Sequence, residues 1–144
     1  MTAITDGAQP QDALVRRITP LTVLPRIDEV VAAHLELGFS RVESGHPGCV
    51  GLAAGGTYHI LATVDFMQDD FRPETVGPLI GKTLPYIYVR SLAEAQDRLG
   101  GAVVLEMAVT RGGTLEAVVQ QHGRHSILAE RLPDRSADTA HPPS

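Results

Sequence analysis

The sequence has few of the residues on which common small-domain classes depend. Its one cysteine, Cys49, excludes an internal disulfide and a cysteine-rich zinc module, so we expect a small buried residue in a reducing compartment. Tryptophan is absent and only 4% of the residues are aromatic, so an aromatic ligand surface must be built from three Tyr and three Phe. No run of 18 apolar residues and no secretory signal pattern occurs, which predicts a cytoplasmic protein without a membrane partner.

Basic charge is also scarce. Twelve basic residues stand against 17 acidic ones, a net charge of −5 that argues against a nucleic-acid partner. The chain contains no G-x-G-x-x-G, no G-x-x-x-x-G-K-[ST], no G-x-S-x-G and no H-E-x-x-H motif. Nucleotide binding by such loops, and serine or zinc hydrolysis, therefore have no support.

The chain length suits one domain with two polar tails. A domain of this size buries roughly 70% of the surface that its unfolded chain exposes, enough for a core without disulfides or a structural metal. Residues 1–15 and 132–144 have too little apolar content to offset the entropy of ordering, so we expect a flexible N-terminus and a disordered C-terminal tail. The folded domain is expected at 16–131.

Hydrophobic patterning divides this domain into two similar halves. Repeat one (17–64) and repeat two (83–131) flank a polar connection at 65–82. In repeat one we expect strands at 18–24, 39–43, 49–54 and 57–64, with a helix at 26–37 that Gly38 ends. In repeat two we expect strands at 83–89, 102–107, 114–121 and 125–131, with a helix at 91–99 that Ser91 and Glu94 open as a capping box.

The two halves also align residue by residue. Leu37-Gly38 matches Leu99-Gly100 and Ile60-Leu61-Ala62 matches Ile127-Leu128-Ala129, with an offset that drifts from 62 to 67 residues. Repetition at this period indicates two copies of one supersecondary unit that must pack together. We predict an α+β protein in which two βαβββ repeats form a curved eight-stranded mixed sheet, an open cup whose concave side both repeats line.

This paired order, with L-G-F at 37–39 and the closing segment EAVVQQHGRHSILAER at 116–131, resembles the vicinal oxygen chelate superfamily. Glyoxalase I, extradiol dioxygenases, fosfomycin-resistance enzymes and bleomycin-resistance binding proteins are members. The resemblance spans about residues 17–131, and the opening TPLTVLPRIDEVVAAHLELGF looks most like the bleomycin-resistance and general glyoxalase-like branch. Two departures are Ala33-His34, where an aromatic pair is usual, and Gln121-His122-Gly123-Arg124, where a D-P-x-G-N turn is frequent.

The resemblance implies a divalent metal held by His, Glu or Gln on the first and last strands of each repeat. Alignment puts Thr19, Ile60, Leu84 and Ile127 at those four positions. A shift by one residue substitutes Pro20, His59, Thr83 or Pro85, and Ser126. Either register supplies at most one good ligand, so we expect a member without metal or other cofactor.

Five residues are candidate ligand contacts: His59, Tyr86, Tyr88, Phe66 and Phe71. His59 is either a cup-lining group or a hydrogen-bonded or surface histidine, because alternation does not decide its face. Tyr86 and Tyr88 share one face of a strand, where they either orient a ligand or pack in a core or interface. No catalytic residue is assigned.

The two phenylalanines lie in the connection among Asp65, Asp69, Asp70 and Glu74. Apolar rings beside carboxylates suit a cationic aromatic ligand, but a solvated loop over a hydrophobic seam explains the same residues. Glu106 and Glu116 alternate with apolar neighbours, so we expect both carboxylates to face solvent.

The function that we expect is binding or sequestration of a small molecule, an antibiotic or metabolite, by a homodimer without metal. The alternative is a lyase, isomerase or dioxygenase of the glyoxalase type with an atypical site, for which His59 with Glu106 or Glu116 is a candidate set. A third possibility is a dimerising scaffold whose cup is filled by its own side chains.

Overall fold

The computed structural model describes residues 12–133, which form one eight-stranded sheet with helices on both sides. The strands are β1 (Val15–Leu24), β2 (Ser40–Glu43), β3 (Cys49–Ala54), β4 (Thr57–Thr63), β5 (Thr83–Val89), β6 (Val103–Val109), β7 (Thr114–Gln121) and β8 (Arg124–Arg131). The helices are α1 (Asp28–Leu37), α2 (Val64–Gln68), α3 (Pro73–Val76), the 3₁₀ turn η1 (Gly77–Leu79) and α4 (Leu92–Leu99). The order of elements in each half is the one that the sequence predicts.

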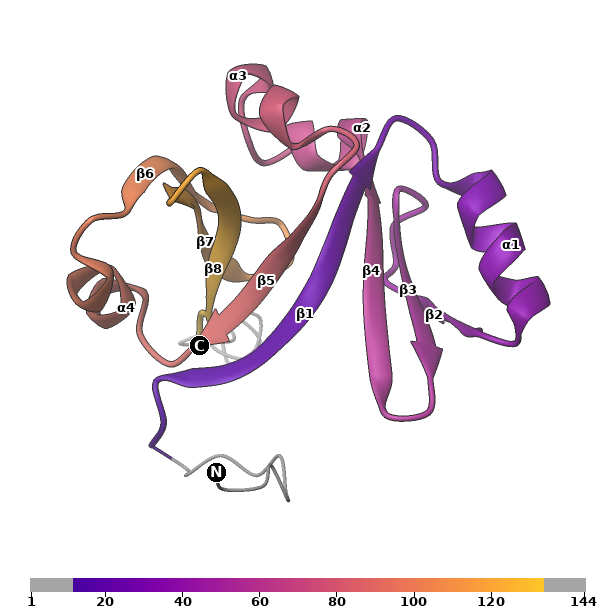
Figure 1. Ribbon diagram of the computed structural model, residues 1–144, viewed down its shortest axis with the longest axis horizontal. Helices are drawn as coiled ribbons and strands as arrows, with labels where there is room; N and C mark the ends of the chain where they lie inside the picture. Colours follow the sequence, from indigo (N-terminus) through magenta and orange to yellow (C-terminus); the bar gives the residue numbers. More distant parts are fainter. Residues whose placement is uncertain (1–11, 134–144) are drawn as a thin grey trace, which may run out of the picture.

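The sheet joins the two repeats through their first strands. Its strand order is β2-β3-β4-β1-β5-β8-β7-β6, with β1 antiparallel to β5 and each of these two parallel to the last strand of its own repeat. Figure 1 shows the two repeats side by side, with β1 and β5 adjacent along the middle of the molecule. The α+β class, the paired βαβββ repeats and the mixed eight-stranded sheet are therefore confirmed.

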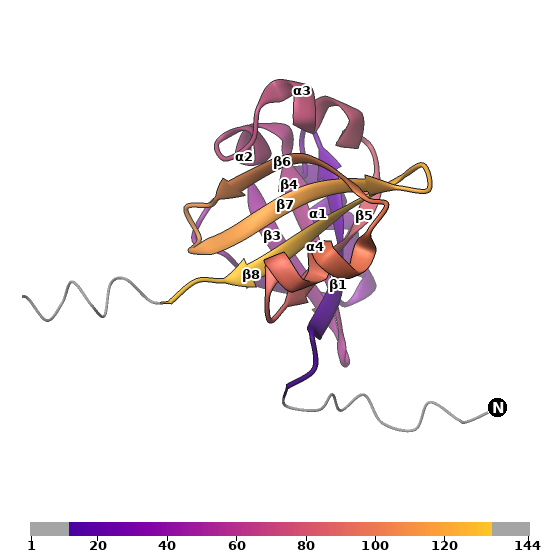
Figure 2. The same cartoon turned by 90° about the vertical axis from the view of Figure 1, so that its left-hand side faces the viewer.

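The two faces of this sheet are covered differently. On the outer face, α1 packs on repeat one and α4 on repeat two, and the two helices lie on opposite outer sides of the molecule (Figures 1 and 2). Leu52 and Leu61 are buried against α1, and Ala117 and Leu128 are buried with the apolar residues of α4. The inner face carries a third cluster, which includes Leu21, Ile127 and Ala129. Strand alternation thus sends successive residues to separate cores.

Local signals explain where the helices begin and end. Gly38 has a φ of +108°, and its N–H and that of Phe39 bond to carbonyls of the last turn of α1, as a terminating glycine does. The Ser91 hydroxyl accepts a hydrogen bond from the Glu94 N–H and caps α4. Helix α1 starts at Asp28, two residues later than the sequence indicates.

The connection between the repeats is helical and partly buried. The Thr63 hydroxyl caps α2 by accepting from the Phe66 N–H. Four connection side chains, Met67, Phe71, Val76 and Leu79, belong to the inner-face core. The connection therefore covers an apolar sheet face, as the alternative of a loop over a hydrophobic seam describes, but it does so with short helices that are partly buried.

The predicted tails lie mainly outside the described residues. Where the structure describes them, backbone contacts extend past the expected domain limits: Arg90 N–H donates to the Leu14 carbonyl, and Leu132 N–H donates to that of Gly113. Among residues 12–133, no helix is long and apolar enough to span a membrane.

Candidate functional site

A cavity of about 450 Å³ lies on the inner face of the sheet. Both repeats and the connection contribute to it. The lining residues are Leu21, Ser44, Gly45, His46, Cys49, Ile60, Phe66, Met67, Asp70, Phe71, Tyr86, Tyr88, Thr110, Arg111, Gly112, Thr114, Glu116, Ile127 and Arg131. Apolar walls with a few convergent polar groups are typical of a small-molecule site.

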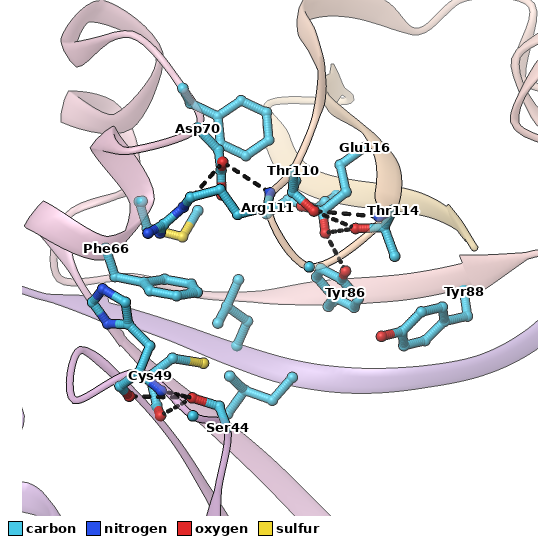
Figure 3. Close-up of a pocket in the computed structure, with 18 of the residues that line it drawn as sticks. Ser44, Cys49, Phe66, Asp70, Tyr86, Tyr88, Thr110, Arg111, Thr114 and Glu116 are labelled. Atoms are coloured by element: carbon cyan, nitrogen blue, oxygen red, sulfur yellow. Dashed lines mark hydrogen bonds and ion pairs between the residues drawn. The ribbon is translucent and has the colours of Figure 1, made fainter. Parts of the chain in front are cut away.

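A buried carboxyl group forms the polar centre of the cavity wall. Glu116 lies on β7 and is 8% exposed. Its Oε2 accepts a hydrogen bond from the Tyr86 hydroxyl of β5 and another, 2.7 Å long, from the Thr114 hydroxyl. Figure 3 shows the three side chains converging, Tyr86 from β5 and both Thr114 and Glu116 from β7, the two strands that flank β8. Thr114 and Glu116 reach the same face because they are two residues apart on one strand.

Burial shifts the protonation equilibria of this cluster. Burial raises the pKa of Glu116, and the hydrogen bonds from Tyr86 and Thr114 offset only part of that effect. Burial and the adjacent Glu116 both raise the pKa of Tyr86, so its hydroxyl stays protonated and donates. The protonated form of Glu116 is thus favoured over a wider pH range than in an exposed glutamate.

An ion pair lies at the connection side of the cavity. Arg111 contacts Asp69 (Nη2–Oδ2, 3.0 Å) and Asp70 (Nε–Oδ1, 3.6 Å), and its backbone N–H donates to Asp70. The same guanidinium lies over the ring of Phe66, 5.5 Å from its centroid. These contacts tie the β6–β7 turn to α2, so the second repeat and the connection meet at this point.

The wall from repeat one is mostly apolar. Leu21 and Ile60 are register partners on β1 and β4, and both face the cavity. Cys49 also lines it and is half-buried, and burial raises the pKa of its thiol. The expectation that Cys49 is small and buried is met only in part, since its strand borders the open space.

Four of the five predicted ligand contacts line the cavity. Tyr86 and Tyr88 lie edge to face with centroids 5.1 Å apart, and Figure 3 shows them in sequence along β5. Phe66 and Phe71 reach the cavity from the connection. The structure brings these four rings together, whereas ligand contact itself stays a prediction.

His59 lies elsewhere. It shares the outer face with Leu61, and its Nε2 forms a 2.7 Å hydrogen bond with the Thr22 hydroxyl. Its ring is 6.4 Å from that of His34 in α1. Burial, and secondarily His34, lower the pKa of His59. The alternative of a hydrogen-bonded histidine describes this placement, and a cup-lining His59 does not.

The expectation of two solvent-facing glutamates is wrong. Glu116 is buried because β7 lies between two strands and both of its faces are covered. Glu106 accepts from the Arg72 backbone N–H at 2.9 Å and pairs with its guanidinium at 3.4 Å. The Thr75 hydroxyl and Arg72 lower the pKa of Glu106, and together they outweigh its desolvation. Of the two, only Glu116 faces the cavity.

The residues at the expected metal positions do not fit a metal. Register places Thr19 opposite Tyr86 and Leu21 opposite Ile60, and Tyr86 is the partner of Ile127. The expected ligand positions thus carry hydroxyl and aliphatic side chains, which are poor ligands for Zn²⁺, Ni²⁺ or Fe²⁺. Within residues 12–133, no three His, Cys, Asp or Glu side chains are grouped as metal ligands.

Comparison with solved structures identifies the fold. A glyoxalase/bleomycin resistance protein/dioxygenase superfamily member from Vibrio splendidus 12B01 superimposes with a TM-score of 0.54 at 13% identity, covering 79% of this chain and 97% of that one. Methylmalonyl-CoA epimerase from Mycobacterium tuberculosis superimposes with a TM-score of 0.56 at 14% identity, covering 91% of this chain and 97% of that one. This is the vicinal oxygen chelate fold. The hypothetical protein BH1468 from Bacillus halodurans C-125 has the same fold, with a TM-score of 0.52 at 15% identity, covering 81% of this chain and 94% of that one.

No protein-family model and no curated protein matches the chain. At these identities the structural likeness concerns the vicinal oxygen chelate fold and its arrangement of strands.

Proposed function

We propose that the protein binds a small organic molecule in the inner-face cavity without using a metal ion. The observation that supports this most directly is the cavity itself, about 450 Å³ and lined from both repeats. That volume lies within the range of about 300–1,000 Å³ found for small-molecule sites. Its aromatic and aliphatic walls suit an apolar ligand body, and the Glu116 cluster and Tyr88 supply polar groups that would orient it.

A pair of tryptophan substitutions tests this proposal. Ile60→Trp places an indole in the cavity, whereas Ile18→Trp adds the same group to a side chain that is 63% exposed on the outer face of β1. Thermal-shift screening would use aromatic metabolites, glycopeptide antibiotics and small organic acids in the presence of a chelator. We expect compounds that stabilise the wild type and Ile18→Trp but not Ile60→Trp. The proposal would be contradicted if a compound stabilised Ile60→Trp and Ile18→Trp equally, or if no compound stabilised the wild type.

The Glu116 cluster favours a second candidate, proton transfer to or from a carbon acid. A carboxyl group with a raised pKa beside a cavity is suited to general acid–base work near neutral pH. NMR detection of deuterium uptake from D₂O next to a carbonyl would reveal the activity in a panel of acyl compounds. An enzyme would be favoured if the wild type catalysed deuterium uptake and Glu116→Gln did so at least about a hundredfold more slowly. No exchange above the uncatalysed rate would leave the binding function alone.

We further propose a homodimer. The outermost strand β6 exposes Val103, Met107 and Val109 at 57%, 44% and 65%, apolar surface that a second subunit would cover. Light scattering after size exclusion would give twice the mass of the chain, and a monomer at tens of micromolar would contradict this.

A further inference from the structure

One end of the cup carries two guanidinium groups that contact the same aromatic ring. The Arg17 guanidinium carbon lies 5.0 Å from the centroid of Tyr88, and that of Arg131 lies 5.8 Å from it. Both distances are within the range of cation–π contact. Tyr88 and Arg131 line the cavity, and Arg17 lies next to it through its contact with the Tyr88 ring.

Strand register fixes this arrangement. Arg17 on β1 is the direct partner of Tyr88 on β5, and Tyr88 in turn pairs with Ala129 of β8, two residues before Arg131. All three side chains therefore project from the inner face of adjacent strands. Their common origin on the sheet, rather than on a loop, makes the spacing of the two cations a property of the fold.

The two arginines lack the partners that the other cavity arginine has. Arg111 contacts both Asp69 and Asp70, whereas within residues 12–133 no carboxylate forms an ion pair with Arg17 or Arg131. The Glu116 carboxyl is instead engaged by the hydroxyls of Tyr86 and Thr114. Among residues 12–133, this end of the cup thus carries two cations without a carboxylate partner, in a chain whose net charge is −5.

We propose that Arg17 and Arg131 hold an anionic group of the ligand, a carboxylate or a phosphate, while its apolar part lies in the cavity. This rests on the proposed binding function and specifies its substrate class. A guanidinium presents a planar set of donors that matches either oxyanion, and stacking on Tyr88 restricts its motion before the ligand arrives. The cationic ligand considered from the sequence is disfavoured, because Arg111 already neutralises Asp69 and Asp70.

Four probes of one shape but different charge test this inference. They are 3-phenylpropionate, 2-phenylethyl phosphate, the neutral 3-phenylpropionamide and the cationic 3-phenylpropylamine, each titrated calorimetrically into the wild type. We expect at least one anion to bind about tenfold more tightly than the amide, and the amine to bind least. The two anions separate a carboxylate site from a phosphate site. Rising salt should weaken binding of the preferred anion but not of the amide.

Arginine-to-glutamine variants provide the matched controls. Arg17→Gln and Arg131→Gln should each weaken the preferred anion about tenfold and leave the amide unchanged. Arg124→Gln removes the same charge from an exposed residue outside this cavity and should have no effect. If the amide binds as tightly as the anions, and its affinity is the same for Arg17→Gln and Arg131→Gln as for the wild type, the cavity is a binding site but the anion inference fails. If none of the four probes binds, both this inference and the proposed function fail.

Discussion

Each face of the sheet holds a titratable side chain whose pKa is shifted by burial, but of the two only Glu116, on the inner face, lines a cavity. On the inner face, burial raises the pKa of Glu116, and on the outer face burial lowers the pKa of His59. Desolvation favours the neutral form in both cases. His59 is hydrogen-bonded to the Thr22 hydroxyl on the face that α1 covers, whereas Glu116 lies against a cavity of about 450 Å³. Position relative to the cavity, rather than residue type, therefore separates a structural group from a candidate functional one.

The largest effect that we expect is structural and belongs to the outer face. Leu52 is fully buried against α1, so Leu52→Ala should lower the free energy of unfolding by about 2–5 kcal/mol, because a cavity replaces its side chain. Urea denaturation followed by circular dichroism measures this. Leu37→Ala is the control, since Leu37 is 78% exposed and its loss should cost about 0.5 kcal/mol or less. Equal losses for the two variants would break the assignment of the outer core.

A smaller effect is expected at the centre of the inner face. Tyr86→Phe removes one of the two hydroxyl donors to Glu116 and leaves Thr114. The free energy of unfolding should fall by about 1–3 kcal/mol, and the pKa of Glu116 should rise further because its charged form loses a donor. Denaturation and carbon-detected NMR of the Glu116 carboxyl check the two parts. An unchanged Glu116 pKa would show that the hydroxyl does not act on the carboxyl.

Glu116 also predicts a pH dependence of stability. The folded protein holds this proton at pH values above the ordinary value of 4.5, where the unfolded chain has released it. The contribution of Glu116 to stability is thus fully present below pH 4.5 and is lost as the pH rises through its folded pKa. Glu116→Gln should flatten this part of the curve relative to the wild type. The opposite sign would contradict this: the free energy of unfolding of the wild type would rise with pH above 4.5, and Glu116→Gln would abolish that rise.

His59 should give the smallest effect, with the opposite dependence. Its folded pKa lies below the ordinary value of 6.5, so its contribution is present above pH 6.5 and is lost as the pH falls through the folded pKa. His59→Gln should remove this loss and change stability at pH 8 by about 1 kcal/mol or less, as one hydrogen bond to Thr22 is altered. Ligand binding should not change. A weaker ligand affinity of His59→Gln would instead indicate that His59 takes part in ligand binding.

The fold could be derived from the sequence because its signals are local. Gly38 and the Ser91–Glu94 pair set helix limits, and the repeated order of strands follows from hydrophobic alternation and turn glycines. The order also indicated the sheet, since a βαβββ unit cannot bury its face alone. Within the repeats only element ends differ, by a few residues, whereas the short helices α2, α3 and η1 of the connection were not expected.

The site was only partly derivable, because it depends on register and on burial from a distance. Tyr86 and Tyr88 were candidates because they alternate, whereas the face of His59 turned on a shift by one residue. Glu116 was misjudged because its neighbours on β7 are apolar on both faces, so alternation does not indicate exposure. The Thr114-x-Glu116 spacing was the available signal, since it places a hydroxyl and a carboxyl on one face. Arg17 and Arg131 lie 114 residues apart and meet only through the strand order.

The most direct test of a ligand cavity that works without a metal combines ligand-induced stabilisation with metal content. The thermal shift given by the compound that most stabilises the wild type would be measured before and after exhaustive chelation, with the metal content of each sample measured by mass spectrometry. We expect the same thermal shift in both samples and less than about a tenth of an equivalent of divalent metal in either. One equivalent of Zn, Ni, Fe or Mn per chain, with a thermal shift that disappears on its removal, would contradict it.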